Sequence, residues 1–179
     1  MKTKFLTTFI VIATIFASCK EESSKTEEIA TKEANNFKVI VNVTIKKDDN
    51  LSLFYTEDGS TDFSQIQPLW VDVKGSDAAQ DVVFNLPEDA MPTQIRLDFG
   101  INKEQETIII NKFSMYYSGK SFEAPGEQFY LYFAPDISKT VFDKDKRTID
   151  AVVKDGVRQY PSFYPNTKPV GEEIAKLVQ

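Results

Sequence analysis

The clearest regular pattern in the chain begins at residue 37, where apolar and polar side chains alternate. The apolar positions are Phe37, Val39, Val41, Val43 and Ile45. Most of the positions between them are polar, among them Lys38, Asn42 and Thr44. Successive side chains of a strand point to opposite faces, so this period of two predicts a strand over 37–45 with one buried face.

Similar short runs follow at regular intervals, and turn residues end most of them. They predict further strands over 51–56, 69–73, 80–86, 93–99, 106–117, 128–133 and 147–153. Only 171–179 has a helical pattern, and it is too short to be stable without packing. Many short strands with no helix between them are typical of a sandwich. The expected fold is therefore all-β: an antiparallel β-sandwich of the jelly-roll or immunoglobulin-like kind, with a short C-terminal helix, over residues 37–179.

The predicted strand 128–133 has rings on both of its faces. Its core face would carry Phe129, Leu131 and Phe133. The same alternation leaves Tyr130 and Tyr132 on the opposite face, where rings with hydroxyl groups can stack on sugars or contact a protein. The alternative is that these tyrosines only pack, with residues 160–165 lying over them.

Aromatic side chains on other predicted strands extend this set. The candidate ligand-binding residues are Trp70, Tyr116, Tyr130 and Tyr132. Trp70 is the only tryptophan of the chain. Aromatic groups of this kind are enriched at binding surfaces because one side chain offers a large apolar area and a polar handle. They therefore mark where a ligand would be sought.

The first residues of the chain have the pattern of a signal peptide. Lys2 and Lys4 precede an apolar run over 5–16, which is too short to span a bilayer. The following Ala17-Ser18-Cys19 resembles the bacterial lipobox, and this resemblance implies cleavage before Cys19 and attachment of acyl chains to it. The alternative is an ordinary secretory signal over 1–18 with a cysteine near the cut. Two or more acyl chains hold a protein durably on a membrane, so the expected partner of Cys19 is the membrane.

Residues 19–36 have too little apolar content to form a core, and they predict a flexible stalk after the acylated cysteine. Lys20-Glu21-Glu22 resembles the acidic export signals of surface lipoproteins in bacteria with two membranes. The alternative is a solvated acidic linker. The expected location is the bacterial cell envelope, lipid-anchored at the outer membrane and exposed at the surface.

Charge and composition exclude several classes of function. The chain has 21 basic and 27 acidic residues, and loss of residues 1–18 would remove two lysines and no acid. An acidic protein repels phosphate backbones, so we expect no nucleic-acid partner. The chain has no histidine and a single cysteine, which rules out imidazole triads and the common zinc sites.

Carboxylates remain as candidate chemistry, but no motif specifies a reaction. A catalytic pair could come from Glu57, Asp58, Asp98 or Glu104, although acids are plentiful in any acidic chain. Calcium could be held by Asp143, Asp145 and Asp150, or by Glu57, Asp58 and Asp62. Neither set has EF-hand spacing. We therefore expect no catalytic residue, no metal and no cofactor, and leave a structural calcium ion open.

Three segments carry a family resemblance. They are Phe84-Asn85-Leu86-Pro87-Glu88, Ile95-Arg96-Leu97-Asp98-Phe99-Gly100 and Ile108-Ile109-Ile110-Asn111-Lys112-Phe113. This stretch, roughly 50–117, resembles carbohydrate-binding and galactose-binding-like jelly rolls, in particular the sandwich modules appended to some bacterial polysaccharide glycosyltransferases. The resemblance implies a fold more than an activity, because such modules place their binding residues in variable loops.

Two functions follow from these observations. The first is a non-catalytic, glycan-binding envelope lipoprotein, and the second is a structural or interaction lipoprotein that contacts another envelope protein and takes no small ligand. The sandwich resemblance and the tyrosines favour the first. The acidic domain on a stalk fits either.

Cys19→Ala is expected to release the protein from the membrane, because the variant lacks the thiol that carries the acyl chain. Fractionation of cells into membrane and soluble material measures the effect, with Ser23→Ala as a control in the adjoining segment. Unchanged membrane association of Cys19→Ala would show that another feature anchors the chain.

Overall fold

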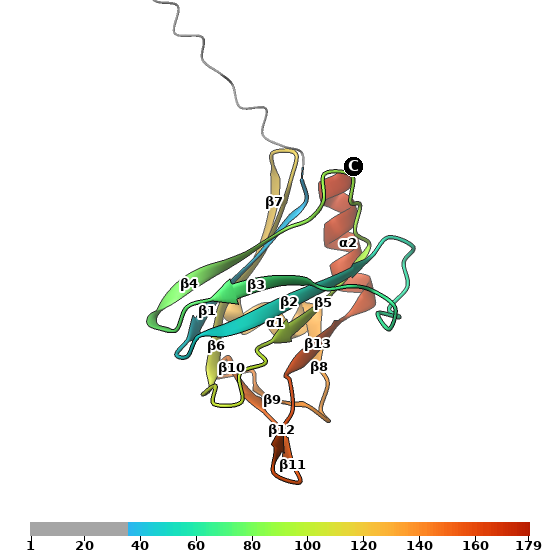
Figure 1. Cartoon of the computed structure of the whole chain (residues 1–179). Coiled ribbons are helices and arrows are strands. Elements are labelled where there is room, and N and C mark those ends of the chain that lie inside the picture. The colour runs from blue at the N-terminus through green and yellow to red at the C-terminus, as the bar shows by residue number, and fades with distance from the viewer. Residues whose placement is uncertain (1–35) are drawn as a thin grey trace, which may run out of the picture. The chain divides into compact units, whose positions relative to one another are not determined.

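Two antiparallel β-sheets pack face to face in the computed structural model, which describes residues 36–179 (Figure 1). This arrangement, with a C-terminal helix, confirms the expected all-β sandwich. The predicted signal peptide 1–18, Cys19 and the stalk up to residue 35 lie outside the described residues.

The first sheet has the strand order β4-β1-β6-β10-β9, with β7 also paired to β6. Its strands are β1 (Lys38–Ile45), β4 (Ser76–Asn85), β6 (Ile108–Tyr117), β7 (Lys120–Pro125), β9 (Thr140–Asp143) and β10 (Thr148–Ala151). Strand β1 lies between β4 and β6, and every second side chain along it is buried. The apolar positions that predict this strand therefore form its core face.

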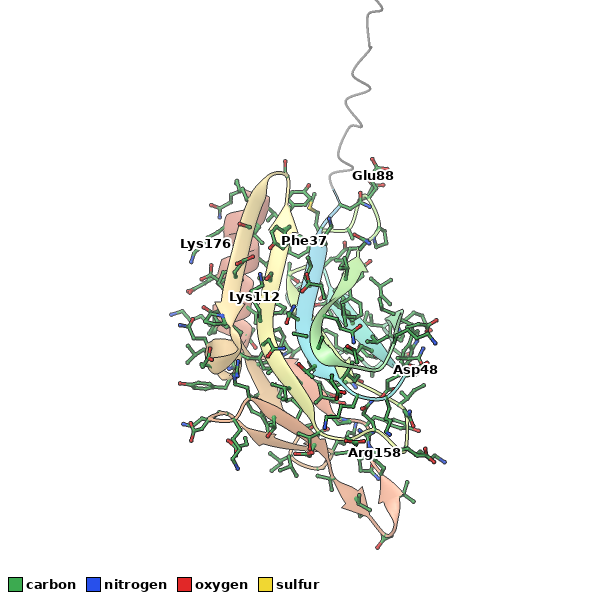
Figure 2. The ribbon with its side chains drawn as sticks, turned by 90° about the vertical axis from the view of Figure 1, so that its left-hand side faces the viewer. Phe37, Asp48, Glu88, Lys112, Arg158 and Lys176 are labelled. Atoms are coloured by element: carbon green, nitrogen blue, oxygen red, sulfur yellow. The ribbon has the colours of Figure 1, made fainter. Side chains whose placement is uncertain are left out.

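The second sheet has the order β3-β2-β5-β13-β8. Its strands are β2 (Asp49–Thr56), β3 (Leu69–Val73), β5 (Gln94–Phe99), β8 (Phe133–Pro135) and β13 (Ser162–Pro165). A separate hairpin of β11 (Val153–Lys154) and β12 (Val157–Arg158) projects from the sandwich. Phe37, near the start of the described chain, and Arg158, in this hairpin, lie toward opposite ends of the domain (Figure 2).

Aromatic rings fill much of the space between the sheets. Phe163 of β13 contacts the rings of Phe99 and Phe129 at centroid distances of 5.4 and 5.2 Å. Phe113 of β6 meets Phe133 at 4.9 Å. Such edge-to-face pairs add to the free energy gained from burying apolar area. The core therefore joins strands of both sheets.

Helix α2 (Thr167–Val178) packs against the sandwich with Val170, Ile174 and Leu177 buried. The spacing of these residues places them on one helical face. The helix predicted over 171–179 is confirmed but begins earlier in the structure, at Thr167. Pro169 lies within its first turn, where a missing backbone N–H costs no helical hydrogen bond.

The strand predicted over 128–133 is wrong. A short 3₁₀ turn, η1 (Gly126–Gln128), leads into one turn of helix, α1 (Phe129–Tyr132). Phe129 and Phe133 stack at 4.8 Å and are both fully buried, a contact that the i,i+4 spacing of a helical turn allows. Leu131, expected in the core, is instead 45% exposed.

Asn166 stabilises this helical turn from the other end of the chain. Its side-chain amide donates to the carbonyl oxygens of Tyr130 and Leu131, each at 3.0 Å. Its backbone N–H donates to the carbonyl oxygen of Tyr132 at 2.7 Å. These bonds supply partners to carbonyls that a single helical turn leaves free. The turn therefore depends on residues far away in the sequence, which local propensity does not show.

A buried carboxylate ties the start of β2 to the connection between β5 and β6. Oδ1 of Asp49 accepts hydrogen bonds from the backbone nitrogens of Asn50, Ile101 and Asn102 at 2.7 to 2.8 Å. Oδ2 accepts from Nε2 of Gln105 at 2.9 Å. A buried charge is tolerated when hydrogen bonds replace its hydration, as they do here. This connection crosses from the second sheet to the first, so Asp49 helps to hold the two sheets in place.

Asp49→Ala is expected to lower the free energy of unfolding by roughly 3 kcal/mol, because it leaves several donors without their acceptor. Denaturant titration followed by tryptophan fluorescence measures the change. Asp77→Ala removes an exposed acid from β4 and serves as the control, with little effect expected. Equal stability of the two variants would contradict a structural role for Asp49.

Candidate functional site

The outer face of the second sheet carries a row of side chains that line up across four strands. Trp70 of β3 lies opposite Ser52 of β2, Ser52 lies opposite Asp98 of β5, and Asp98 lies opposite Ser162 of β13. Neighbouring positions in a sheet have their side chains on the same face and within contact distance. One row therefore brings an indole, two hydroxyls and a carboxylate together.

A pocket of about 280 Å³ opens over this row. Its lining residues are Asn50, Ser52, Phe54, Trp70, Asp98, Gly100, Ile101 and Tyr160. Trp70 and Tyr160 are 52% and 46% exposed, so both rings offer free surface. We call this cavity the Trp70 pocket. Its volume is near the lower end of the range for small-molecule sites, which fits one small ligand or one group of a larger ligand.

Ser52 lies at the floor of the Trp70 pocket with an unusual environment for an outward-facing residue. The side chain is fully buried, with 0% exposure. Its hydroxyl group has no hydrogen-bond partner among residues 36–179. Buried hydroxyls without a partner are uncommon because each one loses its bonds to water. The hydroxyl is therefore a free donor and acceptor beside the cavity.

Asp98 is held in place by an ion pair with Arg96. Nε and Nη2 of Arg96 donate to the two carboxylate oxygens at 2.9 and 2.6 Å. The guanidinium carbon lies 4.5 Å from the ring centre of Phe54 and 4.8 Å from that of Tyr164. These rings fix the arginine by cation–π contacts. The carboxylate therefore has a set orientation, with lone pairs left to accept further hydrogen bonds.

Burial raises the pKa of Asp98 above the usual range of aspartates, and the opposite effect of Arg96 only partly offsets it. Desolvation disfavours the charged form, whereas a neighbouring cation favours it. An aspartate with a raised pKa in a cavity is a candidate for a functional group. Among residues 36–179, Asp98 is the only carboxylate that lines the Trp70 pocket, so this part of the chain places no acid pair there of the kind used in glycoside hydrolysis.

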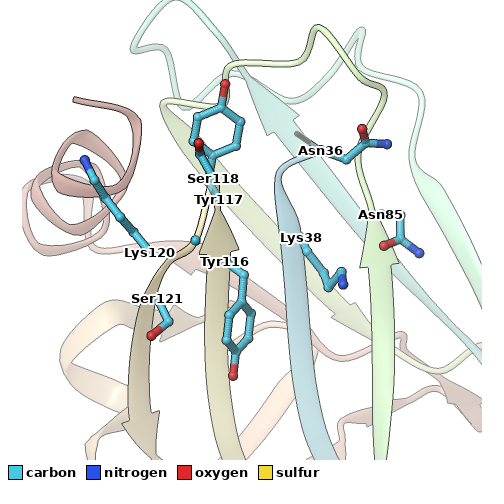
Figure 3. Close-up of a pocket in the computed structure, with 9 residues that line it drawn as sticks. Asn36, Lys38, Asn85, Tyr116, Tyr117, Ser118, Lys120 and Ser121 are labelled. Atoms are coloured by element: carbon cyan, nitrogen blue, oxygen red, sulfur yellow. The ribbon is translucent and has the colours of Figure 1, made fainter. Parts of the chain in front are cut away.

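The structure places Tyr116 in a different pocket, on the outer face of the first sheet (Figure 3). This open cavity of about 500 Å³ has a mainly polar lining that includes Lys38, Asn85 and Tyr117. The hydroxyl of Tyr116 donates to Oε1 of Glu123 at 2.5 Å, which raises the pKa of the tyrosine. The polar end of this ring is therefore already engaged within the chain.

Tyr130 and Tyr132 lie on the single turn of α1 and do not share the face that a strand would give them. Tyr130 is 41% exposed, and Nζ of Lys144 lies 5.3 Å from its ring centre. Tyr132 packs edge-on against Phe122 at 5.0 Å and is half-buried. Of the four predicted residues, only Trp70 lines the Trp70 pocket.

Sequence reasoning missed Tyr160, Ser52 and the cavity that contains them. A usable pattern was present: Ser52 and Phe54 alternate with buried leucines in β2, and Arg96 and Asp98 alternate with apolar residues in β5. Such alternation identifies outward-facing positions. The tertiary fold decides which strands become neighbours. It also decides that the segment around Tyr160 lies beside the pocket.

Two of the acidic side chains considered for calcium already accept hydrogen bonds from backbone N–H groups. Asp143 accepts from the backbone nitrogens of Asp145 and Lys146, each at 3.0 Å. Glu57 accepts from the backbone nitrogen of Met91 at 2.7 Å. Over residues 36–179, no three metal-ligating side chains come together in a metal-binding geometry.

In that same part of the chain, no helix has the length and apolar character needed to cross a bilayer.

Titration of the aspartates by NMR is expected to give a higher midpoint for Asp98 than for Asp136. Burial raises the pKa of Asp98, whereas hydrogen bonds from Ser138 lower the pKa of Asp136. Because folding raises the pKa of Asp98, its ionisation opposes folding at neutral pH, and this penalty fades as the pH falls through the raised pKa. A midpoint for Asp98 at or below that of Asp136 would show that Arg96 outweighs burial.

Comparison with known proteins adds no assignment to this geometry. No protein-family model, no curated protein and no solved structure matches the chain. The residues of the Trp70 pocket therefore carry the functional inference themselves. They combine two exposed aromatic rings, an oriented carboxylate and an unpartnered hydroxyl in one small cavity.

Proposed function

We propose that this chain is a lipid-anchored lipoprotein of the bacterial cell envelope whose β-sandwich binds glycans, without catalysis, at the Trp70 pocket. The observation that carries the proposal is the pairing of exposed rings with a polar floor in one cavity. Sugars have an apolar face of C–H groups and an edge of hydroxyl groups. A site for them therefore needs an aromatic platform and fixed hydrogen-bonding groups.

Trp70 and Tyr160 supply the aromatic part of such a site. Both rings are about half exposed, so a ligand can bury additional aromatic area on each of them. Exposed aromatic surface of this size is unfavourable in water and favours contact with a ligand. Trp70 on β3 and Tyr160 before β13 come from separate parts of the sheet, which allows them to contact one sugar from two directions.

Asp98 and Ser52 supply the polar part. The carboxylate can accept hydrogen bonds from sugar hydroxyls, and its ion pair with Arg96 holds it in one orientation. A group that is already fixed loses little conformational entropy on binding. A charged acceptor also makes stronger hydrogen bonds than a neutral one.

The position of the pocket fits a tethered binding protein. Several of its residues come from β2 and the end of β5. Strand β1 leads from the N-terminal end of the domain to the opposite end of the sheet, where β2 begins. The lipid anchor proposed at Cys19 would attach at that N-terminal end. The stalk predicted over 19–36 would let the domain turn, so that surface glycans could reach the pocket.

A role in contacts with another envelope protein is the second candidate. The β11–β12 hairpin carries two exposed valines, Val153 and Val157, at the end of the molecule far from Phe37. Exposed β-branched residues on a hairpin can contact a partner. The Trp70 pocket has more specific chemistry than this hairpin, so glycan binding is the better supported function.

Trp70→Ala and Tyr160→Ala are each expected to weaken glycan binding at least about tenfold, the effect of losing one stacked ring. The measurement is binding of the full chain to a panel of bacterial and host glycans, with and without calcium. Tyr130→Ala is the matched control, because Tyr130 is similarly exposed but lies on α1 outside the pocket. Absence of glycan binding by folded wild-type protein would overturn the proposal and favour the interaction role.

A further inference from the structure

We propose that the Trp70 pocket recognises the acetamido group of an N-acetylated sugar. This inference rests on the proposed glycan-binding function and names the class of sugar. It follows from the kind of groups that line the cavity and from the neighbouring positions of Ser52 and Asp98. An acetamido group has one methyl group, one N–H donor and one carbonyl acceptor.

The walls of the pocket match the methyl group. Phe54, Trp70, Ile101 and Tyr160 present apolar or aromatic surface, and Gly100 adds no side chain. A methyl group gains free energy when it leaves water for such surroundings. A hydroxyl group in the same position would lose its hydrogen bonds to water and gain none from these walls.

The floor of the pocket matches the amide. The carboxylate of Asp98 is an acceptor with free lone pairs, and it can take the hydrogen of the acetamido N–H. The hydroxyl of Ser52 is a donor with no partner among the described residues, and it can donate to the acetamido carbonyl. Ser52 and Asp98 lie opposite each other on neighbouring strands, so one small amide can meet both.

One further polar group of the lining is already engaged. The side-chain amide of Asn50 donates to Oδ1 of Asp72. The Asp98 carboxylate is an acceptor in the pocket, and the Ser52 hydroxyl, the Tyr160 hydroxyl and the indole N–H of Trp70 are donors, with apolar surface around them. A site with buried polar groups discriminates strongly against ligands that leave those groups unpaired.

Gly100 and Asp49 keep the cavity in this shape. Gly100 has a φ of 83°, in the left-handed region, and a Cβ there would collide with the Asp49 carboxylate. The same carboxylate accepts the backbone N–H of Ile101, the neighbouring wall residue. The rim of the pocket is therefore fixed before any ligand binds, which favours recognition of one group of defined size.

The test measures binding of five sugars to the full chain, held in a detergent without a sugar headgroup. The sugars are N-acetylglucosamine, N-acetylgalactosamine, glucose, galactose and glucosamine, and titration calorimetry or NMR reports each affinity. The two N-acetylated sugars are expected to bind at least about tenfold more tightly than their parent hexoses, as one or two hydrogen bonds and a buried methyl group require.

Ser52→Ala separates the acetamido contact from general sugar binding. Because the Ser52 hydroxyl has no partner, its removal is expected to leave the melting temperature unchanged or higher. The variant is expected to lose most of the preference for N-acetylglucosamine over glucose. Ser114→Ala is the matched control, since Ser114 is another buried serine with an unpartnered hydroxyl but lies on β6 of the other sheet.

The outcomes distinguish this inference from the function on which it rests. Equal affinity for N-acetylglucosamine and glucose would overturn the acetamido assignment and leave glycan binding intact. Tighter binding of glucosamine than of N-acetylglucosamine would show that the pocket binds an ammonium group, which would also overturn the assignment. Loss of all sugar binding in wild-type protein would overturn both. The sugar series uses the unaltered chain, so it stands even where Ser52→Ala fails to fold.

Discussion

The Asp49 carboxylate is the constraint on which the architecture depends. It is buried, and four hydrogen bonds from the chain replace the water that a charged group needs. Those bonds fix the point where the chain leaves the second sheet after β5 and enters the first sheet at β6. Neighbouring residues of the same network, Asn50 and Ile101, also line the Trp70 pocket. The hydrogen bonds of Asp49 therefore stabilise both the fold and the candidate site.

The outer face of the second sheet departs from the usual pattern of a sandwich, in which outward-facing positions are solvated and polar. Here a serine is fully buried, an ion pair lies between rings, and a tryptophan projects into solvent. Two of these features do not improve stability: the buried hydroxyl lacks a hydrogen-bond partner, and the exposed indole gains little free energy from burial on folding. Local departures of this kind are typical of functional sites, where stability is given up for binding.

The sequence predicted the strands whose one face is regularly buried. Strand β1 is the clearest case, because buried and partly exposed side chains alternate along its whole length. Prediction failed at 128–133, where aromatic residues fit a strand by propensity but Phe129 and Phe133 pack as one helical turn capped by Asn166. Strands β9 and β13 have four residues each, too few for a periodic pattern, and β7 has only one fully buried residue among its six.

Trp70 of the candidate site was predicted from its residue type. Ser52 and Tyr160 could not be predicted, because they reach the pocket only through the strand order and through a segment far from Trp70 in the sequence. Strand β3 is at the edge of its sheet, and among residues 36–179 it pairs with β2 alone. An edge strand separates from its sheet at a lower free-energy cost than a central strand. Trp70 therefore lies on the strand of this site that separates most easily, so fraying of β3 would widen the pocket without breaking the pairing of Ser52 with Asp98.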